Sequence, residues 1–351
     1  MVEPSRPDPF ARELERILAR SRPLWEALRG QSVFLTGGTG LFGHWILESA
    51  AYANRALDLG LKVLVLTRNP ESFAARAPHL AADPAIRFHR GNVIDFDFPA
   101  GAYPYVIHGA TTSAAETFRG EDPLAKFDTL VAGTRRTLEF ARRCEARRFL
   151  FLSSGVVYGS PPPSLAAIPE DYLGAPDTCD VDSALGQAKR AAEYLCAHYG
   201  RRHGWEGVVA RCFSFVGPFL PLDLHYAIGN FIDQALRADA IVVTGDGTPL
   251  RSYLYLGDLV SWLLALLIRA APGRAYNVGS DETVTIGGLA RRVGEVLAPG
   301  KPVRILGKPS YSVGNQARNL YVPDITRARQ ELGLAVWTPL EEAIRITGGR
   351  G

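Results

Sequence analysis

The chain has 351 residues, of which 47% are hydrophobic and 21% charged, and its formal net charge is +3. This length suits one large α/β unit, or a large and a small domain that share a cleft. The basic residues form no run, which argues against a nucleic-acid partner. The longest apolar stretch, residues 259–268, is too short to cross a bilayer, and the first residues lack the apolar core of a signal peptide. We therefore expect a cytoplasmic protein with no membrane partner.

Cysteine usage gives no sign of a metal or a disulfide framework. The four cysteines form no C-x-x-C pair, and their spacings match no common zinc pattern: Cys144, Cys179, Cys196 and Cys212. We expect free thiols and no metal site.

The first 30 residues form an extension ahead of the first strand. Apolar residues recur at helical spacing over residues 10–18, and Leu24 and Leu28 follow a proline. The pattern predicts one or two amphipathic helices. Such an extension can pack on the main body or cover an oligomer surface, and we favour packing.

The rest of the chain alternates between strand and helix patterns. Short apolar runs predict strands at residues 32–36, 62–66, 86–89, 105–108, 148–153 and 207–211, with helices between them that include residues 122–143 and 183–199. This alternation predicts an α/β fold with a doubly wound parallel (Rossmann) sheet over residues 31–217. Proline and glycine then become frequent, so residues 218–351 are expected to form mostly a smaller C-terminal substrate-binding lobe. A segment around residues 252–268 is expected to return to the main domain.

A glycine-rich turn follows the first predicted strand and opens a helix. Its spacing is G-x-x-G-x-x-G, and the residues proposed to line a cofactor are Gly37, Thr39, Gly40, Leu41, Phe42 and Gly43. The first glycine permits a tight turn, the second a close approach of a pyrophosphate, and the third close packing of the helix on the sheet. The free N–H groups and the positive end of the helix dipole suit phosphates. Its position between a strand and a helix makes this a dinucleotide-binding motif.

The end of the second strand bears on the choice between NADP and NAD. It reads Leu66-Thr67-Arg68-Asn69, without the carboxylate that would bind the adenosine ribose hydroxyls. An arginine can bind a 2′-phosphate bidentately, whereas a carboxylate would repel it. Arg68 therefore favours NADP over NAD. The alternative is that Arg68 only stacks on adenine or faces solvent.

A serine and a lysine suggest the chemistry. Ser154 follows a predicted buried strand and precedes Val157-Tyr158-Gly159, and Lys189 follows Leu185 by one helical turn. This arrangement resembles the active site of the extended short-chain dehydrogenase/reductase family, the nucleotide-sugar epimerases and dehydratases. That family carries Tyr-x-x-x-Lys on the helix. Ser154 and Lys189 match its pattern, but Leu185 occupies the tyrosine position.

The resemblance implies roles for these residues. In the family, the tyrosine exchanges a proton with the sugar hydroxyl while nicotinamide exchanges the hydride, the lysine lowers the tyrosine pKa and holds the nicotinamide ribose, and the serine bonds the reacting oxygen. Leu185 cannot transfer a proton. Three substitutes stay open: Tyr158, although its motif is usually structural; Lys189, if burial lowers its pKa; and Tyr172, from the preceding loop.

The resemblance also bears on the acidic residues of the 4,6-dehydratases and on the residues that bind cofactor and substrate. The 4,6-dehydratases carry Asp-Glu where this chain has Gly155-Val156, so ordinary 4,6-dehydration is disfavoured. The resemblance, which covers roughly residues 32–340, assigns further cofactor contacts to Asn92, Val93, His108 and Ala110. It assigns substrate contacts to Ser214, Asn230, Arg251 and Arg318, with Arg251 on the diphosphate.

Two functions from different classes follow. The first is a nucleotide-diphosphate-sugar modifying enzyme, an epimerase or atypical dehydratase with tightly bound NADP or NAD, in which another residue replaces the tyrosine or the substrate arrives as a keto-sugar. The second is a catalytically silent paralogue that binds the nucleotide sugar or NADP as a sensor or partner subunit. Retention of both Ser154 and Lys189 favours the enzyme. We expect a homodimer.

Overall fold

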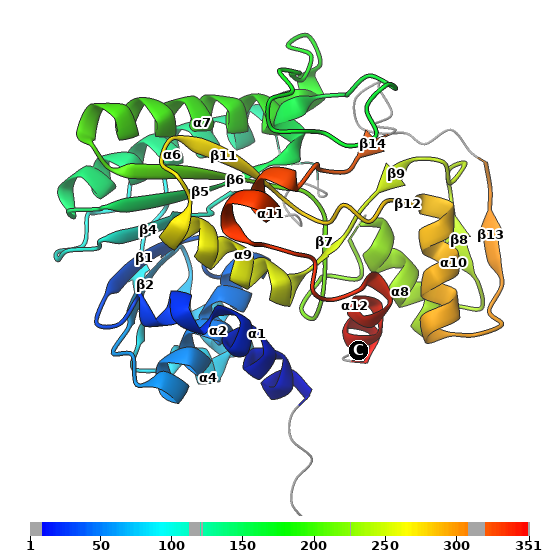
Figure 1. Cartoon of the computed structure of the whole chain (residues 1–351), viewed down its shortest axis with the longest axis horizontal. Helices are drawn as coiled ribbons and strands as arrows, with labels where there is room; N and C mark the ends of the chain where they lie inside the picture. Colours follow the sequence, from blue (N-terminus) through cyan, green and yellow to red (C-terminus); the bar gives the residue numbers. More distant parts are fainter. Residues whose placement is uncertain (1–8, 112–119, 121, 225, 308–319, 350–351) are drawn as a thin grey trace, which may run out of the picture.

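The computed structural model describes residues 9–111, 120, 122–224, 226–307 and 320–349. Its centre is a seven-stranded sheet with the order β11-β6-β5-β4-β1-β2-β3, and all neighbouring strands are parallel (Figure 1). The strands are β1 Ser32–Thr36, β2 Lys62–Thr67, β3 Ile86–Arg90, β4 Tyr105–His108, β5 Arg148–Ser154, β6 Glu206–Cys212 and β11 Arg274–Val278. The order reverses between β1 and β4, which is where doubly wound sheets bind their ligands. The predicted fold class is confirmed.

Helices cover both faces of this sheet, and each face has its own apolar core. One core joins the sheet to α1 (Pro9–Glu26), α2 (Leu41–Leu57) and α9 (Leu256–Arg269). The other joins it to α6 (Pro123–Arg143) and α7 (Ala184–His203). Shorter helical pieces are α3 Pro70–Arg76, α4 Pro78–Ala81, α11 Thr326–Leu332, η1 Gly155–Tyr158 and η2 Val181–Ser183. Among the described residues no helix is long and apolar enough to cross a membrane.

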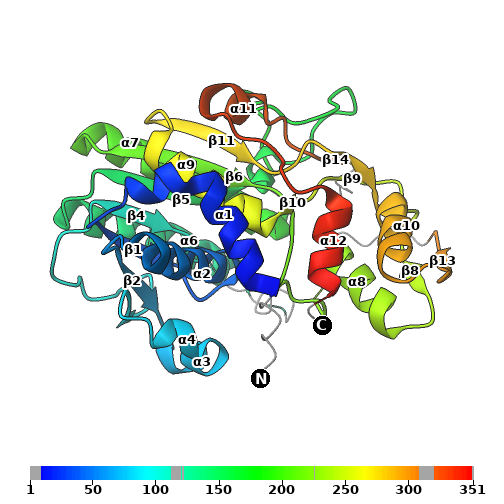
Figure 2. The ribbon, with the colours of Figure 1, turned by 60° about the horizontal axis from the view of Figure 1, so that its bottom comes forward.

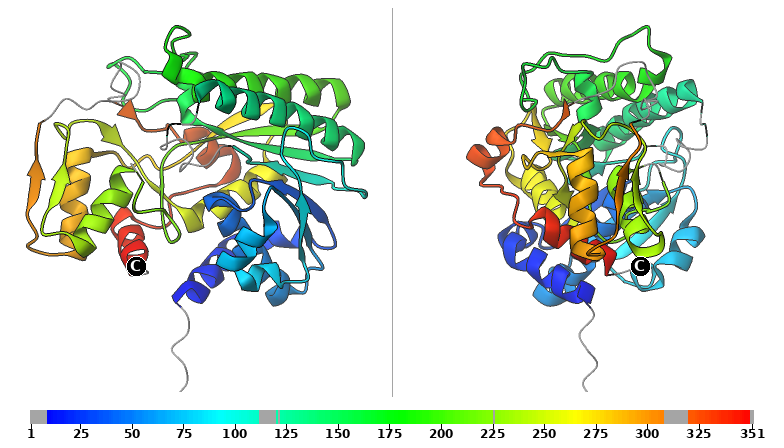
Figure 3. Two further views of the ribbon diagram at one scale, coloured as in Figure 1. Left: turned by 180° about the vertical axis from the view of Figure 1, so that it is seen from behind. Right: turned by 90° about the vertical axis from the view of Figure 1, so that its right-hand side faces the viewer.

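A smaller lobe lies beside the carboxyl ends of the central strands (Figures 1 and 3). It contains α8 (Ala227–Arg237), α10 (Ile286–Leu297) and α12 (Leu340–Gly348), and β8 (Ile241–Val243) pairs with β13 (Val303–Ile305). A three-stranded sheet of order β12-β9-β14 faces the main domain, with strands Val284–Thr285, Leu250–Arg251 and Leu320–Tyr321. The link to the main domain includes β7 (Phe215–Val216), which pairs with β10 (Leu254–Tyr255).

Two sequence-based boundaries need correction. The segment that returns to the main domain does not stop at residue 268, because β11 (274–278) pairs with β6 as the last strand of the large sheet. Also, α7 runs on to His203 rather than ending near residue 199, since Gly204 adopts a left-handed conformation (φ 74°) and caps it only there. The other domain boundaries stay proposals.

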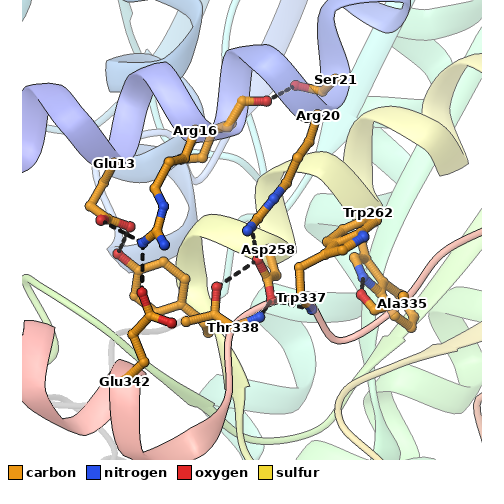
Figure 4. A network of polar contacts seen from close by, with 12 residues as sticks. Glu13, Arg16, Arg20, Ser21, Asp258, Trp262, Ala335, Trp337, Thr338 and Glu342 are labelled. Carbon is orange, nitrogen blue, oxygen red and sulfur yellow. Dashed lines mark hydrogen bonds and ion pairs between the residues drawn. The ribbon is translucent and has the colours of Figure 1, made fainter.

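The N-terminal extension forms one helix, which continues through Pro23. Figure 2 shows α1 lying across α2 and α9, with α12 beside it. The ring of Phe10 packs edge-on against Trp45 of α2 at 5.0 Å. On the α9 side, Arg20 bonds the fully buried Asp258 at 2.7 Å (Figure 4). The extension therefore packs on the main body in this structure.

Candidate active site

The glycine turn between β1 and α2 forms a cradle that side chains would fill. Gly37 has a φ of 76°, and a Cβ on it would lie 2.5 Å from the backbone of Gly109. A Cβ on Gly43 would lie 2.3 Å from the Cα of Gly38. Gly40 caps α2 without any side-chain hydrogen bond, so the first N–H groups of the helix are left for another acceptor. This geometry fits the pyrophosphate of a dinucleotide.

Thr36, at the end of β1, holds in place the segment after β4 that lies opposite the glycine turn. Its Oγ1 accepts hydrogen bonds from the backbone N–H groups of Gly109 (3.2 Å) and Ala110 (3.1 Å). The Thr36 hydroxyl also lies 2.7 Å from Nδ1 of His108, while Nε2 of that ring lies 3.0 Å from Oγ1 of Thr134. Because Thr134 donates its own proton to the carbonyl of Leu130, Nε2 of His108 must be the donor and Nδ1 the acceptor.

The His108 side chain thus positions the loop and points away from the cradle. It is buried between the sheet and α6, and burial lowers its pKa to about 3, so the ring stays neutral. The sequence-based assignment of His108 to the cofactor therefore concerns the backbone that follows it, at Gly109 and Ala110.

The remaining candidate cofactor residues line the same end of the sheet. Thr39, Leu41 and Phe42 are half-buried around the start of α2. At the ends of the outer strands, Arg68 and Asn92 are exposed. Val93 is buried against α6, where a Cβ on Gly133 would lie 2.8 Å from it. Backbone and side chains here fit a dinucleotide that runs from the glycine turn toward Arg68.

The predicted serine and lysine lie at the end of β5 and on α7. Ser154 is the last residue of β5, and its Oγ accepts a hydrogen bond from the N–H of Val156 at 3.3 Å. Lys189 is buried, and its Nζ donates to the carbonyl of Leu152 at 2.7 Å and lies 4.8 Å from the ring centre of Phe151. Burial lowers the pKa of Lys189 to about 8. Leu185 is half-buried one turn earlier on the same helix.

Tyr158 lies in a closed polar network. Its hydroxyl donates to Oδ1 of Asn277 at 2.7 Å and accepts from Arg211 at 2.9 Å. The side chain is 1% exposed, and burial raises its pKa to about 12. The hydroxyl thus donates to one side chain and accepts from another, and the phenol itself is buried, which argues against a contact with substrate. The ring of Tyr172 packs outside it, with its centre 6.2 Å away.

A residue that the sequence reasoning missed lies next to Ser154. The hydroxyl of Tyr321, on β14, is 3.3 Å from the Oγ of Ser154. The same strand pairs with β9 so that Tyr321 lies beside Arg251. Tyr321 belongs to no motif that the sequence analysis recognised, and 166 residues separate it from Ser154, so only the fold brings the two together.

Residue 155 is where the 4,6-dehydratases carry their aspartate, and here the ring of Phe213 occupies the space beside it. A Cβ on Gly155 would lie 2.8 Å from the ring of Phe213, which is itself buried. An aspartate at residue 155 would need that ring to move. The expectation that ordinary 4,6-dehydration is disfavoured stays a prediction.

The described candidate substrate residues lie on the lobe and on the link that leads to it. Ser214 and Arg251 are half-buried, and Nη1 of Arg251 donates to the carbonyl of Leu250 at 2.8 Å. The amide of Asn230, in the orientation that satisfies its neighbours, donates to the carbonyl of Leu224 at 2.6 Å. Arg318 lies outside the described residues. The cysteines are free thiols as expected, and the described residues contain no group of three His, Cys, Asp or Glu arranged for a metal.

Comparison with known proteins identifies the family. Residues 33–279 match the model of the NAD dependent epimerase/dehydratase family. Because the match covers well over half of the chain, this chain belongs to that family, whose description makes its members NAD dependent.

The individual relatives named here share about a third or fewer of the aligned residues with this chain. The chain is 33% identical over 233 residues to UDP-glucuronic acid decarboxylase 5 of Arabidopsis thaliana, a match that covers 66% of this chain and 65% of the relative. It is 29% identical over 317 residues to decarboxylase 2 of the same plant, covering 90% of this chain and 66% of the relative. The matches thus span about two thirds of these relatives' own length.

Solved structures share the fold. UDP-glucose 4-epimerase from Thermotoga maritima, determined with UDP-glucose, superposes with a TM-score of 0.73 at 22% identity and covers 91% of this chain and 98% of its own. UDP-glucuronic acid 4-epimerase from Bacillus cereus, determined with UDP-glucuronic acid and NAD, gives 0.74 at 22% identity with the same coverage.

Proposed function

We propose that the protein is a nucleotide-diphosphate-sugar modifying enzyme, an epimerase or an atypical dehydratase that works with a tightly bound nicotinamide dinucleotide. The observation that carries the proposal is the 3.3 Å contact between Ser154 and Tyr321. It brings the strand end that carries the serine against the small sheet that carries Arg251. A sugar and its diphosphate could therefore be held at one place.

The cofactor would lie along the carboxyl ends of β1, β4 and β5. The N–H groups at the start of α2 would bind its pyrophosphate, and Lys189 would hold its nicotinamide ribose. When bound, the nicotinamide supplies the acceptor and donor for the hydrogen on the reacting sugar carbon. Ser154 would orient the sugar oxygen at that carbon through a hydrogen bond. Lys189 places a buried positive charge beside the site, which favours an oxygen that becomes anionic.

We propose UDP as the first nucleotide to test, because the curated relatives and the structural neighbours named above act on UDP-sugars by their names. The guanidinium of Arg251 would bind the diphosphate, since its planar fork bonds two oxygens at once. Arg251 is half-buried, so part of the binding would take place out of bulk water.

UDP is expected to raise the melting temperature of the wild type, because it binds only the folded state. At a concentration of 100 times Kd the gain is about 2.7 kcal/mol. Arg251→Ala should remove most of that shift, while Arg304→Ala, which changes an exposed arginine of the same lobe on β13, should leave it intact. Differential scanning fluorimetry with and without UDP measures the effect. The nucleotide-sugar proposal fails if neither UDP nor dTDP, GDP or CDP stabilises the wild type.

We further propose that the cofactor is NADP rather than NAD. Arg68 is exposed at the end of β2, and Arg90 of β3 approaches it, with Nη1 of Arg90 3.3 Å from the carbonyl of Arg68. Arg68 follows the end of β2, where no carboxylate is present to repel a 2′-phosphate, and its guanidinium can bind such a phosphate bidentately.

Arg68→Ala should weaken NADP binding about 10-fold or more, because hydrogen bonds to charged groups contribute about 1.5–3 kcal/mol. NAD binding should change little. The matched control is Arg87→Ala, an exposed arginine of β3 that lies three residues away from the strand end. Titration calorimetry on cofactor-free protein measures both affinities. An equal loss for NADP and NAD would refute the role in 2′-phosphate binding.

The expected homodimer and cytoplasmic location stay predictions. Sedimentation equilibrium decides the first, by comparing the mass in solution with the chain mass of 38.2 kDa.

A further inference from the structure

We propose that Tyr321 is the proton-transferring residue of this enzyme and replaces the tyrosine that is missing at position 185. The assignment rests on the proposed function, a reaction on a nucleotide sugar with bound nicotinamide. It also decides between the two mechanisms left open by the sequence, because a phenol at the site removes the need for a substrate that is already a ketone.

The first argument is geometric. The hydroxyls of Tyr321 and Ser154 are 3.3 Å apart. One substrate oxygen can lie within hydrogen-bond reach of both, at about 2.6–3.2 Å from each. This is the arrangement that an acid/base and an orienting serine require. Tyr321 is half-buried, whereas Tyr158 is 1% exposed.

The second argument is the place of Tyr321 in the small sheet. In the parallel pair of β14 and β9, Tyr321 is the partner of Arg251. Paired residues of neighbouring strands lie side by side and direct their side chains to the same face. A nucleotide sugar whose diphosphate is bound by Arg251 would therefore have its sugar close to Tyr321 and Ser154.

The third argument is that the surrounding packing holds the phenol in place. The ring of Phe213 lies 4.7 Å from that of Tyr321 at an angle of 39°. Phe213 can occupy that position because residue 155 is glycine, since a Cβ there would come within 2.8 Å of its ring. The glycine at the dehydratase position and the tyrosine on β14 are thus parts of one arrangement.

The other candidates are held elsewhere. The Tyr158 hydroxyl is shared between Arg211 and Asn277. Nζ of Lys189 donates to the carbonyl of Leu152. Leu185 has no proton to give. The ring of Tyr172 packs against that of Tyr158, with 6.2 Å between the ring centres. Tyr321, by contrast, has its hydroxyl 3.3 Å from that of Ser154.

The proposed step is a proton transfer coupled to oxidation of a sugar alcohol. The O–H bond of the substrate hydroxyl breaks, and its proton forms a new O–H bond with the ionised phenol of Tyr321. The oxygen's electron pair forms the second bond of a carbonyl, and an oxidised nicotinamide, when bound, would supply the acceptor for the hydrogen and the two electrons that leave the same carbon. In the return step the phenol gives the proton back to that oxygen, while the hydrogen and its two electrons would return from the nicotinamide to the carbon.

Tyr321→Phe removes only the hydroxyl oxygen and is the test. With UDP-glucose and UDP-glucuronic acid as probes, the single-turnover rate of nicotinamide reduction, followed by absorbance, should fall by about 10²–10⁴-fold. Affinity for the UDP-sugar, measured by calorimetry without turnover, should fall by about 2- to 10-fold, while that for UDP alone stays unchanged. Tyr194→Phe, which changes an exposed tyrosine of α7, is the matched control and should keep the wild-type rate.

A second variant keeps the test independent of local packing. Adding Leu185→Tyr to Tyr321→Phe puts a phenol back at the family's position. If Tyr321→Phe removed proton transfer, the double variant should reduce nicotinamide at least about tenfold faster than Tyr321→Phe alone.

Three results would overturn the assignment. Tyr321→Phe with the wild-type rate, in protein that still binds UDP, would refute the role of Tyr321 but not the proposed function. Wild type that binds UDP but reduces no nicotinamide with either sugar would do the same, because no alcohol would then be deprotonated. Wild type that binds none of the nucleoside diphosphates would refute the proposed function, and this assignment with it.

Discussion

Replacing Lys189 with methionine is expected to abolish most of the turnover without weakening the fold. Its ammonium group lies on α7 beside the end of β5 and donates to the carbonyl of Leu152 at 2.7 Å. In the proposed function this charge holds the nicotinamide ribose and stabilises the reacting oxygen. We expect the turnover rate to fall by about 10²–10⁴-fold, the usual effect of removing an acid/base or its partner.

The same substitution should lower the turnover but not the stability of the fold. Burial lowers the pKa of Lys189 from 10.5 to about 8, because the charged form is poorly solvated inside the protein. Below pH 8 the lysine is charged in both the folded and the unfolded chain, and folding bears the full desolvation cost. Between pH 8 and 10.5 the unfolded chain binds more protons than the folded one, so this group makes the wild type more stable as pH rises.

Methionine keeps a similar volume and carries no charge. Lys189→Met should therefore melt at or above the wild-type temperature at pH 7, and its advantage should shrink as pH rises through 8 toward 10.5. Melting curves at pH 7 and 9.5 measure this, with Lys62→Met, an exposed lysine of β2, as the control that should shift neither stability nor turnover. A variant with full turnover would show that the lysine has no part in the reaction. A lower melting temperature at pH 7 would show that its bond to Leu152 outweighs its desolvation.

The parts that could be predicted from sequence depend on local pattern. Strands and helices of the main domain follow from apolar runs and periodicity, and the glycine turn from the need of Gly37 for a positive φ and of Gly43 for close packing. Ser154 and Lys189 were found because they match a known spacing. Each of these signals lies within one element or between two neighbouring ones.

The parts that could not be predicted depend on contacts between distant segments. Tyr321 lies on a strand of two residues, too short to show a pattern, and it reaches Ser154 only because the chain returns from the lobe. Strand β11 was not predicted for a related reason. It pairs with β6, but the elements β7 to α9 lie between the two strands in the chain. The partner of Asp258 likewise comes from α1, 238 residues earlier in the chain.

That last contact leads to the largest expected effect on stability. The Asp258 carboxylate is fully buried and accepts four hydrogen bonds: from Arg20 at 2.7 Å, from the N–H groups of Trp337 at 3.0 Å and Thr338 at 2.8 Å, and from the Thr338 hydroxyl at 3.1 Å (Figure 4). It thus joins α1, α9 and the segment that leads into α12. Burial raises its pKa, so the charge is kept in place by these partners at a desolvation cost.

Asp258→Ala should lower the free energy of unfolding by about 3–5 kcal/mol, because the arginine and two buried N–H groups lose their acceptor. Urea unfolding measures it. The matched control is Asp239→Ala, an exposed aspartate of the lobe, which should change stability by no more than about 0.5 kcal/mol. Arg20→Ala should cost less in the Asp258→Ala background than in the wild type, because the two side chains share one interaction.

This network lies with α1 and α9 on one face of the sheet, whereas Ser154, Tyr321 and Arg251 lie where the strands end toward the lobe. Asp258→Ala protein that is still folded at low temperature should therefore bind UDP with an affinity close to that of the wild type. If instead it unfolds at the wild-type urea concentration, the N-terminal helix is held by its apolar contacts with α2 and α9 alone. If it stays folded but loses UDP, the helix acts on the site through α9, and the extension would be part of the functional machinery rather than a support for the fold.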